Sequence, residues 1–249
     1  MGKLSISAAS HTGCVRSNNE DMILVNDRTI RGGFYETELS TEGTDRFLFA
    51  VADGMGGHNA GEVASEMTLT NLRYFISDLP RGLSVVEFKE AVDKWLGSIN
   101  ALVEGKGLSE PEKKGMGTTL VALIYYCGHV MAMSCGDSRL YRFRDGKLAQ
   151  LTEDHTLVKS NGPDQHSSAI TNCIGAGCRT SFVDFYDYTN DVHSGDIYLM
   201  CSDGLNDMLW HPEIEALVKK GATAEAFCEA AVEAGGFDNV STLLIEVIK

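Results

Sequence analysis

The sequence predicts an α+β fold in which antiparallel sheets are covered by pairs of helices. Short apolar runs typical of buried strands follow one another along the 249-residue chain, and segments with helical spacing of apolar residues come in pairs. Strands in consecutive runs, rather than in alternation with helices, favour antiparallel pairing. No low-complexity linker, internal repeat or shift in composition divides the sequence, so we expect residues 1–249 to form a single domain.

Strands are expected where a short apolar run, or an alternation of apolar and polar residues, is bounded by turn residues. They cover residues 3–9, 22–26, 46–52, 118–127, 129–135, 139–144, 147–151, 181–188, 196–202 and 241–248. Two amphipathic helices follow the third strand, with apolar stripes at Leu69, Leu72, Ile76 and Leu79 and at Phe88, Val92, Trp95, Ile99 and Leu102. Two more are expected at about 212–220 and 223–234. The helical spacing predicts that these stripes pack against the core and bind no cofactor.

Three of the expected strands run directly into an aspartate beside a glycine. These pairs are Asp53-Gly54, Gly136-Asp137 and Asp203-Gly204. A carboxylate at the end of a buried strand is costly to desolvate unless a cation or a hydrogen-bond donor meets it. Two further acidic clusters come just before strands, namely Asn19-Glu20-Asp21 and Asp238-Asn239.

The end of an antiparallel strand lies beside the start of its neighbour, so these carboxylates can gather at one edge of a sheet. The pattern predicts that they converge on a hard metal ion. Five unrelated polar turns are the alternative.

The composition is that of a soluble globular protein, with 43% hydrophobic and 22% charged residues. With 21 basic and 35 acidic residues the net charge is −14, which opposes non-specific binding to nucleic acid or to an anionic membrane. No signal peptide is evident, and the longest apolar run, Leu120–Cys127, is too short to span a bilayer. We therefore expect a cytoplasmic monomer with no nucleic-acid or membrane partner.

The cysteines are odd in number and show no C-x₂-C spacing, which indicates free thiols in a reducing cytosol. They are Cys14, Cys127, Cys135, Cys173, Cys178, Cys201 and Cys228. The segment Cys173–Arg179 satisfies the C-x₅-R pattern of cysteine-dependent phosphatases, which place a low-pKa thiol at a helix N-terminus. However, Thr180–Tyr188 alternates like a strand, and Asn172 rather than a histidine precedes the cysteine. We therefore expect no cysteine nucleophile here.

Seven short motifs follow one another from residue 13 to residue 241. They are Gly13–Asp21, Val51–His58 with Gly61–Ser65, Gly117–Thr119, Cys135–Arg139, Leu151–His155, Ser202–Asp207 and Asp238–Ser241. In type and order they resemble the motifs of the metal-dependent serine/threonine protein phosphatases, the protein phosphatase 2C family, and the Val51–His58 motif is similar to that of its bacterial members. The resemblance implies a four-layer fold, in which a central β-sandwich flanked by helix pairs carries a two-metal site at one edge.

The resemblance also assigns roles to individual residues. Asp53 would bridge both metal ions, and the carbonyl of Gly54 would bind one of them. Asp203 and Asp238 would bind the second ion. A glycine suits position 54 because a side chain would hinder its carbonyl from turning toward an ion.

Other residues would act around the two ions. Asp21, with Glu20 behind it, would hold metal-bound waters, whereas Asp137 and Asp207 match the positions of a weaker third ion. All-oxygen ligands favour Mg²⁺ or Mn²⁺ over zinc. Arg16 has the planar fork that suits two phosphate oxygens, although a surface salt bridge to Glu20 or Asp21 is the alternative.

Two features depart from the family pattern. Many eukaryotic relatives have a histidine two residues after the bridging aspartate, proposed as a general acid, where this sequence has Met55. His58 follows three residues later and is expected to shape the loop, with a catalytic role as the alternative, and a metal-bound water could protonate the leaving group instead. His155 is expected to form structural hydrogen bonds. The stretch 156–171 is short for the flap of bacterial relatives, and its polar, turn-rich part Lys159–Ser168 predicts a mobile loop.

The predicted function is hydrolysis of phosphoserine and phosphothreonine in proteins by a dinuclear Mg²⁺ or Mn²⁺ centre, with a metal-bound water as the nucleophile. The partners would be phosphoproteins modified by a serine/threonine kinase. One alternative is a pseudophosphatase that binds phosphoproteins without turnover, but such a protein would be expected to lose a metal-binding aspartate. Another is a metal phosphodiesterase or nuclease, which the acidic composition and the motif order disfavour.

Overall fold

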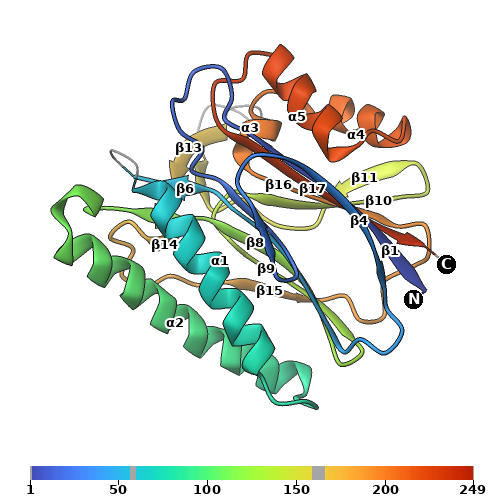
Figure 1. The fold of residues 1–249 in the computed structure, drawn as a ribbon, viewed down its shortest axis with the longest axis horizontal. Helices are drawn as coiled ribbons and strands as arrows, with labels where there is room; N and C mark the ends of the chain where they lie inside the picture. The colour runs from blue at the N-terminus through green and yellow to red at the C-terminus, as the bar shows by residue number, and fades with distance from the viewer. Residues whose placement is uncertain (1, 57–59, 159–165, 249) are drawn as a thin grey trace.

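Two six-stranded antiparallel sheets pack face to face at the centre of the molecule (Figure 1). The computed structural model describes residues 2–56, 60–158 and 166–248. From edge to edge, the first sheet contains β11 (Lys147–Gln150), β10 (Arg139–Arg144), β16 (Ile197–Cys201), β17 (Val240–Ile248), β1 (Lys3–His11) and β4 (Gly33–Ser40). The second contains β15 (Asp184–Asp187), β9 (His129–Cys135), β8 (Leu120–Tyr126), β5 (Arg46–Ala52), β2 (Met22–Val25) and β3 (Arg28–Ile30).

Two smaller sheets complete the β-structure of the described residues. One has the order β14 (Ile174–Gly175), β7 (Gly117–Thr118) and β6 (Gly54–Met55), and the other pairs β12 (Thr156–Val158) with β13 (His166–Ile170). Strand β6 follows β5 after a single residue, and β7 leads into β8 in the same way. The three-stranded sheet therefore extends from the end of the second large sheet at which β5 ends and β8 begins.

Helices cover the outer face of each large sheet. The long helices α1 (Gly61–Asp78) and α2 (Val85–Ser109) pack on the second sheet, and the 3₁₀ turn Pro111–Lys113 follows them. The short helix α3 (Asp203–Asn206), with α4 (His211–Lys219) and α5 (Ala224–Glu233), packs on the first sheet, and Figure 1 shows the two helix layers on opposite sides. Among the described residues, no helix is both long and apolar enough to cross a membrane.

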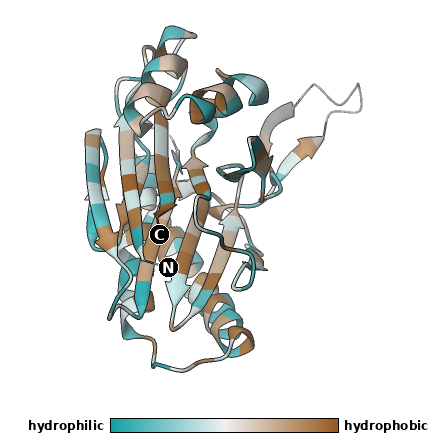
Figure 2. Ribbon diagram, turned by 90° about the vertical axis from the view of Figure 1, so that its right-hand side faces the viewer, coloured by the Kyte–Doolittle hydropathy of each residue, from teal (hydrophilic) through white to brown (hydrophobic). Residues whose placement is uncertain are grey.

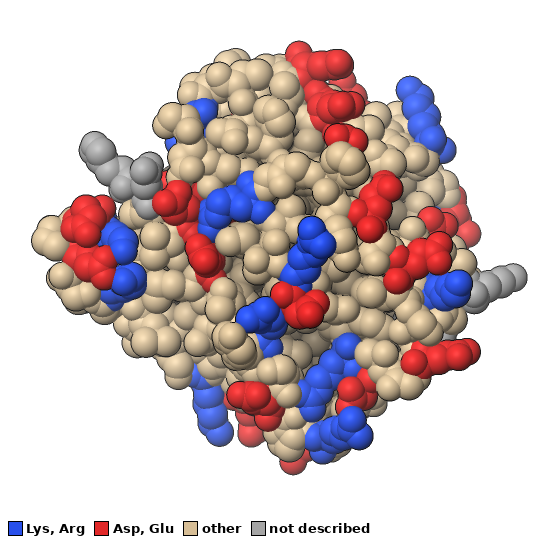
Figure 3. Space-filling view, viewed as in Figure 1, with Lys and Arg blue, Asp and Glu red and all other residues tan. Residues whose placement is uncertain are grey.

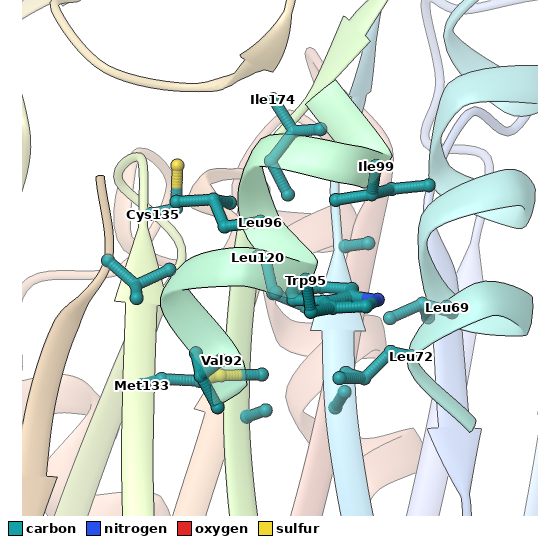
Figure 4. Close-up of a cluster of buried hydrophobic side chains, with 14 of the residues drawn as sticks. Leu69, Leu72, Val92, Trp95, Leu96, Ile99, Leu120, Met133, Cys135 and Ile174 are labelled. Carbon is teal, nitrogen blue, oxygen red and sulfur yellow. The ribbon is translucent and has the colours of Figure 1, made fainter. Parts of the chain in front are cut away.

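Alternate side chains of strand β5 pack into two different layers of the fold. Phe47, Phe49 and Val51 pack between the two sheets. The intervening residues Leu48 and Ala50 face the helix layer formed by α1 and α2. Side chains alternate along a strand, so a continuous apolar run can serve both layers. Figure 2 shows hydrophobic residues along the strands of both large sheets. Figure 4 shows Leu69 and Leu72 of α1 and Trp95 and Ile99 of α2 within one cluster of buried side chains.

The predicted α+β sandwich between two helix layers is confirmed, and all four predicted helices are present. The prediction overlooked β3 and β4, and also the short strands β6, β12, β13 and β14. Strand β4 lies at an edge of its sheet, and none of its side chains is fully buried, so its polar sequence carries no run of apolar residues. The predicted strand 118–127 is divided at Thr119 into β7 and β8.

The prediction of a mobile loop over Lys159–Ser168 is wrong for the part that the structure describes, because residues 166–168 belong to strand β13. Strands β12 and β13 pair there, with Thr156 opposite Ile170. The Lys159–Gln165 part of that prediction lies outside the described residues, as does His58. The predicted strand 181–188 is shortened to β15, because Phe182 instead donates its N–H to the side chain of Asn172.

Candidate metal centre

Five aspartates lie just after the end or just before the start of a strand. We call the part of the molecule that they form the carboxylate edge. The aspartates are Asp21, Asp53, Asp137, Asp203 and Asp238. Met22 pairs with Ala52 across β2 and β5, which places Asp21 and Asp53 at the same end of the second sheet. In the first sheet Cys201 pairs with Thr242, near Asp203 and Asp238. Strand pairing thus brings together aspartates that are distant in the sequence.

Three carboxylate oxygens of this edge are buried without a hydrogen-bond partner among the described residues. They are Oδ1 of Asp21, Oδ1 of Asp137 and Oδ1 of Asp203. Buried polar atoms are nearly always paired in folded proteins, so each unpaired one needs an explanation. Carboxylate oxygens are the donors that Mg²⁺ and Mn²⁺ prefer, and these residues therefore fit such a cation by their chemistry.

The geometry supports a cation less directly. Within residues 2–56, 60–158 and 166–248, no group of three or more Asp, Glu, His or Cys side chains has the arrangement of an assembled coordination shell. The features that favour a cation at this edge are the unpaired oxygens and the concentration of negative charge.

Burial and mutual repulsion raise the pKa values of these aspartates. Burial, followed by the charges of Asp21 and Asp203, raises the pKa of Asp53 well above its ordinary value. Burial is also the main cause that raises the pKa of Asp21 to about 7, of Asp203 to about 6 and of Asp137 to about 7. The charge of Asp203 contributes to the raised pKa of Asp53, so these two carboxyl groups lie close enough to repel each other. A cation at this edge would replace protons.

Asp21 is fully buried and is oriented by serines whose role the sequence did not indicate. Ser202 Oγ donates to Asp21 Oδ2 at 2.7 Å, whereas the hydroxyl of Ser241 donates to Ser10 Oγ at 2.8 Å. Ser202 Oγ in turn accepts the Ser241 N–H at 3.0 Å. Ser202 directly precedes the candidate ligand Asp203, and Ser241 is the second residue of β17. These positions within the motifs are the signal that could have identified the two serines.

Asn239 is a second residue whose role the sequence did not indicate. Its Oδ1 accepts the N–H of Glu20 at 2.8 Å, and its Nδ2 donates to the carbonyls of Thr12 and Asn18 at 2.8 and 2.9 Å. One buried side chain therefore fixes the loop before β2 against the start of β17. This contact holds the acidic cluster of one sheet against that of the other.

Gly54 lies where a side chain has no room. A Cβ atom at this position would stand 2.1 Å from the carbonyl oxygen of Gly61 and 2.6 Å from that of Glu20. The preceding residue is fixed as well, because the Asp53 carbonyl accepts hydrogen bonds from Thr118 Oγ1 at 2.8 Å and from the Thr119 N–H at 2.9 Å. This close packing accounts for glycine at position 54, and whether its carbonyl binds an ion stays a prediction.

Arg16 is half exposed and forms an ion pair with Asp238, with Nη2 and Oδ2 at 2.6 Å. The partner is thus neither Glu20 nor Asp21, which were the expected partners if Arg16 made a salt bridge. Partial burial raises the pKa of Glu20, and a hydrogen bond from the Gly61 backbone opposes this shift. The structure places Arg16 and Glu20 beside the carboxylate edge, where the guanidinium faces a cluster of negative charge.

The two residues predicted for a third ion differ in exposure. Asp137 is 7% exposed and lies close enough for the charge of Asp203 to raise its pKa further. Asp207 is exposed, and its N–H donates to the Asp203 carbonyl at 2.8 Å, one helical turn away. Nearby, Arg139 binds both oxygens of Asp154, which fixes the strand that follows Asp137.

His155 forms structural hydrogen bonds, as predicted. Its Nδ1 accepts the Gly136 N–H at 3.0 Å, and its Nε2 lies 3.0 Å from Asp184 Oδ2. The C-x₅-R segment also behaves as expected, because strand β14 rather than a helix follows Cys173. Burial raises the pKa of Cys173 to about 12, the opposite of what a thiolate nucleophile needs.

An antiparallel β-sandwich with aspartates gathered at its strand ends is the arrangement expected of a metal-dependent phosphatase. Comparison with known sequences identifies the family. The sequence model of the protein phosphatase 2C family matches residues 36–235, so the chain belongs to this family.

Two curated relatives align with almost the whole chain. Serine/threonine protein phosphatase PstP of Mycobacterium tuberculosis is 34% identical over 255 residues, which covers 98% of this chain and 45% of PstP. Serine/threonine phosphatase stp of Listeria monocytogenes is 32% identical over 251 residues, covering 94% of this chain and 92% of stp. The chain thus spans less than half the length of PstP and nearly all of stp.

Solved structures agree with this assignment. The S. agalactiae serine/threonine phosphatase superposes with a TM-score of 0.80 at 28% identity, covering 98% of this chain and 99% of that one. The catalytic domain of PstP in complex with 2 manganese ions gives a TM-score of 0.72 at 30% identity, covering 99% of this chain and 100% of that one.

Proposed function

We propose that residues 1–249 are a single catalytic domain that hydrolyses phosphoserine and phosphothreonine in proteins with the help of divalent metal ions. Membership of the protein phosphatase 2C family supports this, as do the names of the relatives that align with almost the whole chain. The observation that carries the proposal is the set of unpaired buried oxygens on Asp21, Asp137 and Asp203. Such oxygens are costly unless a cation compensates them.

The proposed cofactor is Mn²⁺ or Mg²⁺, with two ions at the carboxylate edge and a weaker third. The proposed ligands are Asp53 and the Gly54 carbonyl for the first ion, Asp53, Asp203 and Asp238 for the second, and Asp137 and Asp207 for the third. The manganese ions in the solved PstP structure support this choice of metal. When bound, such ions lower the pKa of water and offset the charge on phosphoryl oxygens.

The remaining polar residues of the site bind and orient the reactants in this proposal. Arg16 is half exposed and already bonded to a carboxylate, so it can exchange that carboxylate for the oxygens of a phosphate group. Asp21 and Glu20 hold water molecules in position through their carboxylate oxygens. Ser202 keeps Asp21 in a fixed orientation, because it donates to one carboxylate oxygen and leaves the other free to accept.

We further propose that the substrates are phosphoproteins modified by a serine/threonine kinase, and that the chain acts as a cytoplasmic monomer without a membrane partner. Nucleic acid is not a proposed partner, because the net charge of −14 opposes it. On the face shown in Figure 3, Lys and Arg lie among Asp and Glu and form no continuous basic patch.

The test measures turnover of p-nitrophenyl phosphate and of a phosphothreonine peptide by the purified chain, with Mn²⁺, with Mg²⁺ and with EDTA. We expect turnover of both substrates with either metal and none with EDTA. Turnover that persists after the metal has been stripped would contradict the metal-dependent mechanism. A folded, metal-loaded protein that binds the phosphopeptide but does not hydrolyse it would instead support the pseudophosphatase alternative.

A further inference from the structure

The segment Cys173–Cys178 contributes no ligand to the proposed metal centre, and its backbone makes a tight turn. Gly175, Ala176 and Gly177 all have positive φ angles, of 81°, 53° and 78°. The Cys178 N–H donates to the Gly175 carbonyl at 2.9 Å, which closes the turn. Glycine adopts positive φ without steric cost, so the two glycines allow the chain to reverse here. The reversal brings Cys173 and Cys178 together.

Both residues contact the same carbonyl oxygen, that of Gly175, to which the Cys173 thiol donates at 3.6 Å and the Cys178 N–H at 2.9 Å. Both are free cysteines, and they differ in exposure: Cys173 is 7% exposed, whereas Cys178 is partly exposed. Burial, and then the neighbouring Cys178, raise the pKa of Cys173. Cys178 is therefore the thiol that a small solute reaches more readily.

Polar contacts fix both ends of the turn. Asn100 on α2 accepts the Gly175 N–H at 2.7 Å and donates to the Cys178 carbonyl at 3.1 Å. Ser181 Oγ donates to the Cys173 carbonyl at 2.6 Å. The intervening Ile174 is buried with Leu96 and Ile99 beneath α2 (Figure 4), which anchors the segment in the core. The fold thus holds Cys173 and Cys178 at the two ends of one fixed turn, around the Gly175 carbonyl.

We propose that Cys173 and Cys178 form a modification site at which a hydroperoxide produces a disulfide. The Cys178 sulfur attacks one peroxide oxygen, the O–O bond breaks, and the Cys178 proton leaves with the departing hydroxide as water. The Cys173 sulfur then attacks the resulting sulfenic acid, so that the S–S bond forms, the S–O bond breaks and a second water leaves. Two thiols lose two electrons and two protons in total, and one molecule of hydrogen peroxide is reduced to two waters.

The proposal does not depend on the phosphatase activity, and mass spectrometry of the full chain tests it. The reduced chain is treated with hydrogen peroxide, its remaining thiols are blocked with N-ethylmaleimide, and it is digested with trypsin. The tryptic peptide of residues 160–179 contains Cys173 and Cys178 and no other cysteine. We expect this peptide to lose two hydrogens and to take up no N-ethylmaleimide. The untreated sample should take up two molecules.

Variants test the order of the two steps. In Cys173→Ser, we expect the sulfenic acid to persist on Cys178, where dimedone traps it. In Cys178→Ser, we expect Cys173 to stay unmodified under the same conditions. Cys127→Ser is the matched control, because Cys127 is also partly exposed and lies in the turn between β8 and β9, and it should form the disulfide like the wild type.

Two results would overturn the proposal, and both are read on wild-type protein, so they do not depend on how the variants fold. In the first, the peptide of residues 160–179 stays in its dithiol form while another cysteine, such as the exposed Cys14, is oxidised. In the second, this peptide is cross-linked to the peptide of residues 115–139, which carries Cys135, the buried thiol close to both Cys173 and Cys178.

Discussion

Two regions of the molecule bury aspartate side chains in opposite ways. In the region around Arg144, Asp196 is 1% exposed, and both its oxygens accept hydrogen bonds from Arg144 at 2.6 Å. Burial alone would raise the pKa of Asp196, but Arg144 and the backbone N–H of His193 bring it below its ordinary value. Asp191 next to it bonds to Arg142 and Arg144, which lower its pKa to about 2. Each negative charge here has a cation as its partner.

At the carboxylate edge, the corresponding charges have no such partner. Asp21 is as buried as Asp196, but burial raises its pKa to about 7, and one of its oxygens has no hydrogen-bond partner among the described residues. The same fold thus contains buried aspartates with an arginine partner and buried aspartates without one. The Asp196 site shows that this protein can pair a buried aspartate with arginine where the aspartate has a structural role. The contrast supports the proposal that the carboxylate edge binds a cation.

The largest expected effect is on catalysis. Asp53→Ala or Asp203→Ala should lower turnover at least about 100-fold, since even partners of metal ligands contribute 10- to 100-fold. The melting temperature of the metal-free protein should stay the same or rise, because removing one of several repelling carboxylates relieves an unfavourable charge. The measurements are p-nitrophenyl phosphate turnover with saturating Mn²⁺ and thermal unfolding in EDTA.

A large drop in the melting temperature of these metal-free variants would instead mark Asp53 and Asp203 as structural residues. In that case the contrast between the two regions would not hold.

The paired region predicts the reverse outcome. Asp196→Asn leaves the Arg144 guanidinium without its buried partner, and we expect a loss of about 3 kcal/mol in the free energy of unfolding. Turnover per folded molecule should stay within about twofold of the wild type, because Asp196 does not belong to the carboxylate edge. Urea denaturation and active-fraction kinetics measure the two effects. Unchanged stability would show that the arginine pairing contributes little.

The residues beside the ligands should have a smaller effect. Ser202→Ala removes the donor that orients Asp21, and we expect turnover to fall by about 10- to 100-fold. Ser134→Ala is the matched control, since Ser134 is equally buried but its Oγ has no hydrogen-bond partner in the described chain. Equal losses in the two variants would attribute the effect to packing, and the role assigned to Ser202 would be wrong.

The contrast also shows what the sequence could predict. The aspartates that belong to the carboxylate edge were recognisable, because Asp53 and Asp203 end apolar strands beside a glycine, a local pattern. Contacts between distant parts of the sequence could not be predicted in this way. The ion pair of Arg16 with Asp238, for example, joins residues 222 positions apart. For the same reason the roles of Ser202 and Asn239 were not predicted, since serine and asparagine beside a turn are common and only the tertiary structure gives them a partner.

The fold divides in the same way. Apolar periodicity predicted the core strands and all four long helices, whereas the polar edge strand β4 has no such signal. The ion-pair cluster of Arg142, Arg144, Asp191 and Asp196 was not predicted either. Its arginines lie on strand β10 and its aspartates in the loop before β16, so no short motif contains all four.

Arg16→Ala is expected to have the smallest effect on turnover. If the guanidinium binds phosphate similarly in the ground and transition states, KM for p-nitrophenyl phosphate should rise about tenfold while kcat changes less. The matched control is Arg81→Ala, because Arg81 also forms a single exposed ion pair. Its partner Asp45 precedes β5, whereas Asp53 follows β5 at the opposite end of the strand. An unchanged KM with a collapsed kcat would show that Arg16 acts mainly on the transition state.

The most direct test of the carboxylate edge is calorimetric titration of the metal-free chain with Mn²⁺ at pH 6 and pH 8. With pKa values of about 7 for Asp21 and about 6 for Asp203, these carboxyl groups still hold protons at pH 6 and have lost most of them at pH 8. Metal must displace those protons, so binding should be weaker at pH 6 and should release more protons there. Asp203→Asn should lose most of the affinity and Asp196→Asn none. A folded wild-type chain that binds no Mn²⁺, or an Asp203→Asn variant that binds as tightly, would contradict the assignment.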